Sequence, residues 1–171
     1  PKEEALREWL VATFGQGEQR PWALLMIGVD NIERINQRFG RSGGDDALHT
    51  VAYLLRNYHS ARRGRETDGQ TDRQVIFKPS GPRFAYLVGG VTVSDAATVA
   101  EELRQSVSES AMFLEQITIS IGVTGNEELE AGLDEPDERL IARAQARLQL
   151  ARASGMNTVC ASDPEGAAGL G

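Results

Sequence analysis

The stretch WALLMIGV, residues 22 to 29, sets the strongest limit on the fold of this chain. It contains no charged or polar side chain, and such a run indicates a strand that is buried on both of its faces. A strand with one face in water would instead alternate apolar and polar residues. The chain must therefore supply a layer of structure on each side of this strand.

The rest of the chain is predicted to add helices and further strands. Apolar residues recur at helical spacing in several segments, over residues 2–14, 32–39, 45–55, 93–110 and 137–153. Apolar or β-branched runs predict strands over residues 74–78, 84–88, 116–123 and 157–160. Ser94 or Asp95 is expected to cap a helix, and residues 41–44 and 62–73 are expected to be loops. This order predicts an α/β fold, in which helices cover a sheet with an internal antiparallel hairpin.

Composition excludes several classes of function. The chain has 171 residues and a formal net charge of -7, which argues against a nonspecific nucleic-acid binder, since such proteins present a basic face. No apolar run reaches the ~20 residues of a membrane helix, so no membrane contact is expected. The single cysteine, Cys160, suits a reducing cytoplasm. Residues 1–161 are expected to form one domain, and the Gly/Ala-rich residues 162–171 to link it to a following domain.

Several separated pieces of the sequence agree in order and spacing with one family. They are GVDNIERIN at 28–36, Phe39-Gly40, Gly44-Asp45 with Leu48, SGPRF at 80–84, ISIGV at 119–123 and residues 146–157. Together they resemble the GGDEF domain, the diguanylate cyclase module of bacteria, over residues 1–160. The resemblance implies a fold similar to class III nucleotide cyclases, with about five strands and helices on both faces of the sheet.

The catalytic positions of that family are altered here. Active members use two metal ions, held by an acid at the end of the first strand and by the signature glutamate. The resemblance puts Gly28 and Arg83 at these two positions and Pro82 at the signature aspartate. Glycine offers no ligand and arginine repels a divalent cation. No catalytic residue, metal site or cofactor is therefore expected, and Mg²⁺ would be needed only by an active enzyme.

Arg83 itself has two interpretations. At the tip of a hairpin, an arginine is usually a solvated charge. The alternative is that Arg83 stands in for a metal ion and pairs with phosphate oxygens, which would allow a nucleotide to bind without turnover.

The positions that contact guanine in the family are retained. The resemblance assigns them to Asn36 and Asp45, whose amide and carboxylate suit the edges of the base. Another interpretation stays open, in which Asp45 caps a helix and Asn36 bonds nearby backbone. Asp30 also occupies a family position, and it is expected to cap the helix that follows the first strand.

Phosphate contacts are partly retained. Asn31, Ile32 and Glu33 begin a helix whose backbone N–H groups can face phosphate. In the closing motif, the resemblance assigns one phosphate-contacting charge to Arg152, whereas Met156 replaces the other.

An inhibitory site for the product, cyclic di-GMP, is also typical of the family. It is an R-x-x-D motif shortly before the signature, where this chain has Thr71 and Gln74, which cannot serve. Arg65 and Asp68 spell the motif further upstream, and a longer loop would bring them into place. Such a motif also arises readily by chance in a charged loop.

These observations predict a cyclase-inactive regulatory domain of cyclic di-GMP signalling. It would bind GTP or another guanine nucleotide and modulate an attached domain, with an EAL phosphodiesterase domain or a sensory domain as the expected neighbour. The alternatives are an active cyclase that works as a head-to-tail homodimer, a cyclic di-GMP receptor that uses Arg65 and Asp68, and a protein-interaction scaffold without a ligand.

Overall fold

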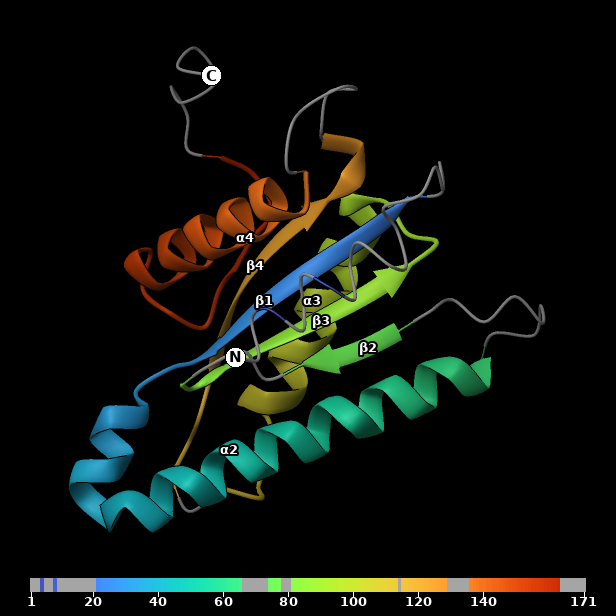
Figure 1. The fold of residues 1–171 in the computed structure, drawn as a ribbon. Helices are drawn as coiled ribbons and strands as arrows, with labels where there is room; N and C mark the ends of the chain where they lie inside the picture. Colours follow the sequence, from blue (N-terminus) through green and yellow to red (C-terminus); the bar gives the residue numbers. More distant parts are fainter. Residues whose placement is uncertain are drawn as a thin grey trace.

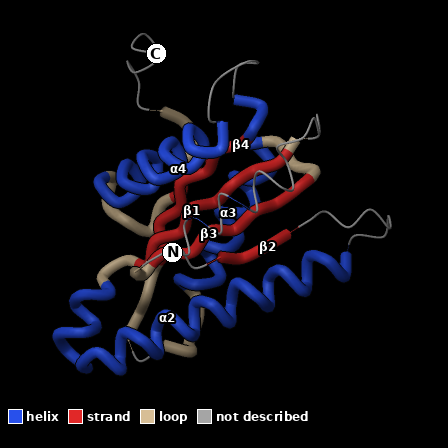
Figure 2. The backbone as a smooth tube through the Cα atoms, in the orientation of Figure 1, coloured by secondary structure: helices blue, strands red, loops and turns tan. Residues whose placement is uncertain are grey.

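A mixed sheet forms the centre of the protein (Figures 1 and 2). The computed structural model describes residues 4, 8, 21–65, 74–77, 81–113, 115–128 and 136–163. Within these residues the sheet has five strands in the order β2-β3-β1-β4-β5. Their bounds are Trp22–Val29 for β1, Gln74–Phe77 for β2, Arg83–Gly89 for β3, Ile119–Gly125 for β4 and Val159–Cys160 for β5. All neighbours pair antiparallel except β4 and β5, which are parallel.

Helices cover both faces of the sheet. Helices α2 (Ile32–Arg65) and α3 (Val93–Ser108) pack on one face, and α4 (Pro136–Ala153) packs on the other. In Figure 1, α3 passes behind the sheet and α2 runs below it. The predicted α/β fold, with its hairpin and its two helical layers, is confirmed. In the part of the chain that the structure describes, no helix combines the length and apolar character needed to cross a bilayer.

Strand β1 is buried on both faces, as its sequence predicts. Ala23, Leu25 and Ile27 join the core beneath α2 and α3. The alternate residues Leu24 and Met26 join the core beneath α4. Because strand side chains alternate between the faces of a sheet, one apolar strand contributes to both cores.

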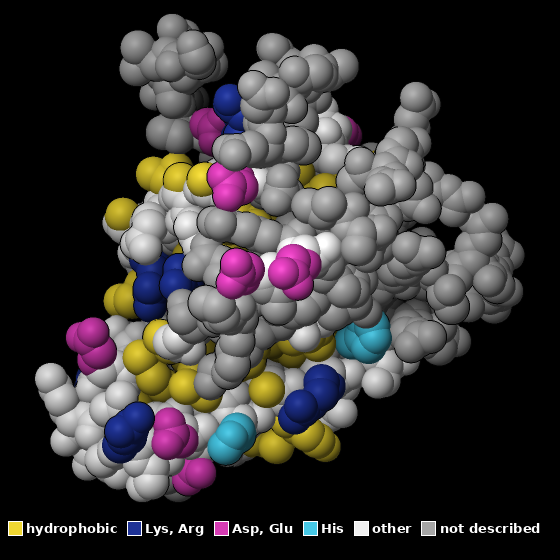
Figure 3. Space-filling model, in the orientation of Figure 1, with side chains coloured by type: hydrophobic (Ala, Val, Ile, Leu, Met, Phe, Trp, Pro, Cys, Tyr) yellow, Lys and Arg dark blue, Asp and Glu magenta, His cyan; other side chains and the backbone are white. Residues whose placement is uncertain are grey.

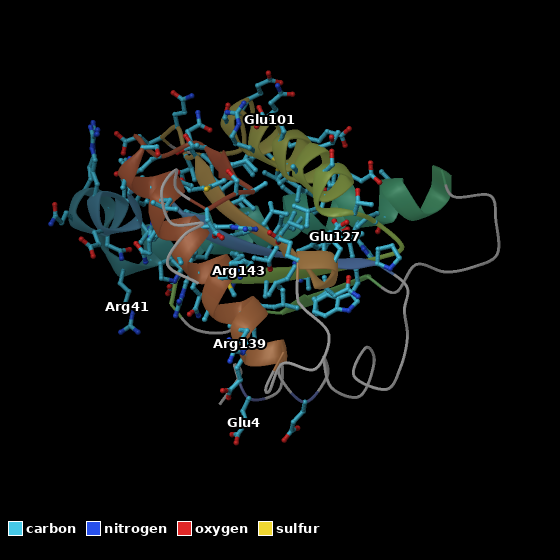
Figure 4. All side chains as sticks on the ribbon, turned by 90° about the horizontal axis from the view of Figure 1, so that it is seen from above. Glu4, Arg41, Glu101, Glu127, Arg139 and Arg143 are labelled. Atoms are coloured by element: carbon cyan, nitrogen blue, oxygen red, sulfur yellow. The ribbon has the colours of Figure 1, made fainter. Side chains whose placement is uncertain are left out.

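Helix α2 contains a sharp kink at Gly40, whose φ of 76° and ψ of 174° are not helical. The chain resumes the helix at once, so the predicted loop over residues 41–44 is wrong. Gly44 serves close packing inside the helix and not a loop, because a β-carbon at this position would lie 1.7 Å from Oδ1 of Asn36. Arg41, the first residue after the kink, points away from the domain (Figure 4).

Other expected boundaries move as well. Thr92 caps α3 by accepting a hydrogen bond from the N–H of Asp95, so neither Ser94 nor Asp95 is the cap. Helix α2 continues to Arg65, which shortens the loop expected from residue 62. The predicted helix over residues 2–14, of which only residues 4 and 8 are described, and the expected linker beyond residue 163 lie outside the described residues.

Gly122 lets α4 lie directly against β4. A β-carbon at this position would lie 2.1 Å from the carbonyl oxygen of Ala144 and 2.5 Å from the amide nitrogen of Leu148. Both atoms belong to the helix backbone and cannot rotate away. We expect Gly122→Ala to lower the free energy of unfolding by about 1–3 kcal/mol, the usual range for overpacking, in urea denaturation.

Gly28→Ala is the matched control for this substitution. Its β-carbon would meet side-chain atoms and no backbone, namely the flexible end of Leu148 at 3.2 Å and Cζ of Arg152 at 3.6 Å, on the same face of the sheet. The loss at Gly28 is therefore expected to be the smaller one. Equal losses at both positions would show that backbone contact with α4 does not set the cost.

Candidate nucleotide-binding site

The end of β1 meets the beginning of β3. Gly28 is the direct antiparallel partner of Arg83 in the strand register. Residues that face each other across antiparallel strands share a face of the sheet, so both positions belong to the face that α4 covers. Arg83 is half-buried as the first residue of β3, and it is not the solvated charge expected at a hairpin tip. The two positions that resemble the metal-binding acids of the family are thus adjacent in space.

Arg152 reaches the same point from the last turn of α4. Its Cζ atom lies 3.6 Å from where a β-carbon on Gly28 would be. Its Nη2 donates to the carbonyl oxygen of Val29 at 3.3 Å, and its Nε lies 3.7 Å from Oδ1 of Asp30. The Arg152 side chain is 31% exposed, so it is held against the strand end and still reaches solvent.

Asp30 does not cap α2, which corrects the expectation from the sequence. It is a buried carboxylate that connects separate elements of the fold. It is 1% exposed. Its carboxylate accepts hydrogen bonds from the hydroxyls of Thr118 at 2.8 Å and Ser120 at 2.9 Å. It also accepts from the backbone N–H of Asn157 at 3.0 Å. This carboxylate therefore ties the end of β1 to β4 and to the loop after α4.

A cleft of about 680 Å³ opens beside this connection. It is lined by the start of α2, the β2–β3 turn and the end of α4, through Asn31, Ile32, Glu33, Arg34, Gln37, Pro82, Arg152 and Met156. Two of these residues have left-handed backbone, Asn31 with φ of 59° and Met156 with φ of 64°. Non-glycine residues in this region cost energy and concentrate at functional sites. The sequence missed this signal, because strain in the backbone leaves no pattern in the residues.

The kink of α2 brings together the two positions assigned to the guanine base. Asn36 lies against Gly44, the residue that precedes Asp45, and the side chains of Asn36 and Asp45 are both exposed. Since α2 resumes at residue 41, Asp45 lies inside the helix and does not cap it. The expected cap is therefore wrong, and the interpretation of Asp45 as a ligand to a base stays a prediction.

Comparison with known proteins gives the family. The chain matches the family described as "Diguanylate cyclase, GGDEF domain" over residues 4–158. The chain belongs to the GGDEF family. This membership places it among the domains of cyclic di-GMP signalling.

Individual relatives of this GGDEF domain are named cyclases. Diguanylate cyclase A of Treponema denticola is 29% identical over 163 residues, which cover 92% of the chain and 40% of the relative. Diguanylate cyclase DgcM of Escherichia coli K12 is 32% identical over 142 residues, or 82% of the chain and 31% of the relative. The chain thus spans less than half the length of these two relatives.

Solved structures share the fold. The active GGEEF domain of a diguanylate cyclase from Vibrio cholerae has a TM-score of 0.76 and 25% identity, covering 92% of this chain and 94% of that one. The GGDEF domain of DgcB from Caulobacter crescentus, solved in complex with c-di-GMP, has a TM-score of 0.74 and 22% identity, over 92% and 88% of the two chains.

The side chains of this GGDEF domain do not fit the two metal ions of an active cyclase. Divalent magnesium prefers carboxylate oxygens. Among the described residues that line the cleft, Glu33 is the one carboxylate. The carboxylate of Asp30 already accepts hydrogen bonds from Thr118, Ser120 and Asn157. Within the described ranges no group of three or more His, Cys, Asp or Glu side chains could hold a metal ion.

The R-x-x-D motif is only half visible. Arg65 is the last residue of α2, and Asp68 lies outside the described residues. The structure therefore leaves the cyclic di-GMP site at Arg65 and Asp68 a prediction.

Proposed function

We propose that this GGDEF domain is a regulatory domain that binds a guanine nucleotide and does not convert it to cyclic di-GMP. The observation that carries the proposal is the pairing of Gly28 with Arg83 at the end of β1, next to Arg152. A cyclase must neutralise a triphosphate and activate a hydroxyl with metal ions, and the side chains of these residues offer no oxygen ligand for them.

The nucleotide would lie along the first turns of α2. Asn36 and Asp45, on either side of the kink, are the base contacts that the resemblance to the family suggests. Asn31, Ile32 and Glu33 line the cleft at the start of α2, where the first backbone N–H groups of a helix have no partner within the helix. Together with the cleft-lining Arg152, they would receive the phosphates.

The consequence of binding would be passed to another part of the same protein or to a partner. An attached EAL or sensory domain in the cytoplasm, or a second copy of the chain, remains our proposal for that receiver. A protein partner has a parallel in diguanylate cyclase SiaD from Pseudomonas aeruginosa, 24% identical with a TM-score of 0.70, which was solved in complex with its activator SiaC. On the face drawn in Figure 3, acidic and basic side chains are interspersed, which supports a partner other than nucleic acid.

We expect GTP to raise the melting temperature of the domain and to remain uncyclised. A ligand at about 100 times its Kd stabilises a protein by about 2.7 kcal/mol, which a thermal shift detects. The same sample, incubated with Mg²⁺ and analysed by chromatography, should contain no cyclic di-GMP.

Variants and a second nucleotide make this test specific. Asn36→Ala and Asp45→Ala are expected to reduce the shift with GTP, and ATP is expected to give a smaller shift than GTP because its base presents different edges. Formation of cyclic di-GMP would establish an active cyclase instead. A protein whose melting temperature ignores saturating GTP would be a scaffold without this ligand.

A further inference from the structure

We infer that the cleft takes its nucleotide as the metal-free triphosphate, so that Mg²⁺ weakens binding instead of supporting it. This inference rests on the proposed function and specifies the form of the ligand. In it, arginine guanidinium groups act where catalytic members of the family place metal ions.

The first argument is the position of the two arginines. Arg83 starts β3 as the register partner of Gly28, on the face of the sheet that α4 covers. The Cζ atom of Arg152 lies 3.6 Å from the β-carbon position of Gly28 on that same face. Because glycine has no side chain, the Arg152 guanidinium occupies the space into which an acid at residue 28 would project. Two cationic residues, Arg83 and Arg152, therefore belong to the same strand end, and Arg152 also lines the cleft.

The second argument is the balance of charge around that point. The anion beside Arg152, Asp30, is buried, and its oxygens accept hydrogen bonds from Thr118, Ser120 and Asn157. It lies 3.7 Å from Arg152 and orients that guanidinium without turning into the cleft. Among the described residues of the cleft wall, Arg34 and Arg152 outnumber the one acid, Glu33, although Nη2 of Arg34 also lies 3.8 Å from Glu115.

The third argument is the chemistry of the ligand. Free GTP carries more negative charge than its magnesium complex, and guanidinium groups bind phosphate oxygens through paired, charge-assisted hydrogen bonds. A magnesium ion on the same oxygens would compete with those hydrogen bonds and would sit beside like charges. Loss of one charge-assisted hydrogen bond corresponds to about a tenfold change in Kd.

Isothermal titration of the domain with GTP tests the inference. One titration contains EDTA and the other contains excess MgCl₂, with KCl adjusted to equal ionic strength, since salt alone screens charges. We expect the Kd to be about tenfold higher with MgCl₂. Guanosine, which has no phosphate, serves as the control ligand and should bind equally under both conditions.

Variants assign the effect to residues. Arg83→Gln and Arg152→Gln are each expected to raise the Kd for GTP in EDTA about tenfold and to reduce the difference between EDTA and MgCl₂. Arg56→Gln, at an exposed position of α2 away from the cleft, should leave both Kd values unchanged. The melting temperature of each unliganded variant verifies that it folds, and Arg83→Gln carries the test if Arg152→Gln unfolds.

The outcomes separate the two proposals. Tighter binding of GTP with MgCl₂ than with EDTA, or equal binding in both, overturns the metal-free inference and leaves nucleotide binding standing. Absence of GTP binding under both conditions overturns the proposed function and the inference with it.

Discussion

Replacing Asp30 with alanine is expected to lower the free energy of unfolding by about 3–5 kcal/mol, the range for removing one member of a buried charged network. The substitution would leave the hydroxyls of Thr118 and Ser120 and the backbone N–H of Asn157 without their acceptor. It would also leave Arg152 without its neighbouring anion. Urea denaturation followed by circular dichroism measures the loss.

Two controls identify the cause of that loss. Asp30→Asn keeps the shape of the side chain and removes its charge, so we expect a smaller loss than with alanine. Asp46→Ala removes an exposed carboxylate from α2, and it should change stability by no more than about 0.5 kcal/mol. If Asp30→Ala lowers the free energy of unfolding no more than Asp46→Ala does, the Asp30 carboxylate does not stabilise the connection between β1, β4 and the loop after α4.

Substitution of Asp30 is also expected to affect nucleotide binding in the cleft. Arg152 is held at the strand end partly by Asp30, and the loop at Asn157 is anchored by it. Arg104 of α3 provides a second hold on that loop, since its Nη1 donates to Oδ1 of Asn157 at 2.8 Å. A domain with Asp30→Asn should therefore remain folded but bind GTP more weakly.

Asp30 illustrates why the sequence predicted the helices and strands better than the side-chain contacts between them. An aspartate directly after a strand and before a helix looks locally like a cap. Its partners Thr118, Ser120 and Asn157 are separated from it by 88, 90 and 127 residues, so no local pattern names them. A signal was available in the spacing of Thr118 and Ser120, which puts two hydroxyls on the same side of the chain where β4 begins.

The kink of α2 illustrates a different limit. Gly40 and Gly44 are both glycines, a residue type that commonly interrupts helices, and the sequence therefore predicted a loop between them. In the fold, Gly40 supplies the positive φ and Gly44 supplies only space for Asn36. The residue type is the same, and tertiary packing decides which property of glycine is used.

The functional link between Gly28 and Arg83 was predictable from the sequence, because the family motifs assign both residues to metal-ligand positions. The motifs did not show that the two residues are neighbours in space. The antiparallel register of β1 and β3 then makes them neighbours. Long-range pairing of this kind follows once the sheet order is known, whereas the position of Arg152 against Gly28 depends on how closely α4 packs.

A second buried charge lies at the opposite end of the β1–β4 pair, and the sequence did not reveal it. Arg147 of α4 is 2% exposed. It donates to the carboxylate of Glu128 at 2.6 and 2.8 Å, to the carbonyl oxygen of Val123 at 2.7 Å and to Asp163 at 3.2 Å. Burial acts to lower the pKa of Arg147, but the hydrogen bonds and charges of Glu128 and Asp163 raise it overall.

Glu128 belongs to a turn, η1 (Asn126–Glu128), in which each side chain accepts from a different neighbour. Asn126 accepts from the N–H of Trp22 at the start of β1. Glu127, labelled in Figure 4, accepts from the N–H of Val93 at the start of α3. Glu128 accepts from Arg147 of α4. This turn therefore joins the sheet to a helix on each of its faces.

We expect Glu128→Ala to lower the free energy of unfolding by about 3 kcal/mol, because it leaves the guanidinium of Arg147 buried without its closest anion. The value lies at the lower end of the range for buried pairs, since Glu128 is 22% exposed and Asp163 remains. Urea denaturation measures the loss. GTP binding should be unchanged, because the turn and the cleft lie at opposite ends of β1.

A double variant decides whether the charge is the cause. Adding Arg147→Met to Glu128→Ala removes the stranded cation and keeps an apolar side chain in its place, so the double variant should be more stable than Glu128→Ala alone. If the two losses simply add, Glu128 and Arg147 act independently and the ion pair does not join α4 to the sheet. Recovery in the double variant, together with unchanged GTP affinity, would separate the charge that holds the fold from the charges that receive the nucleotide.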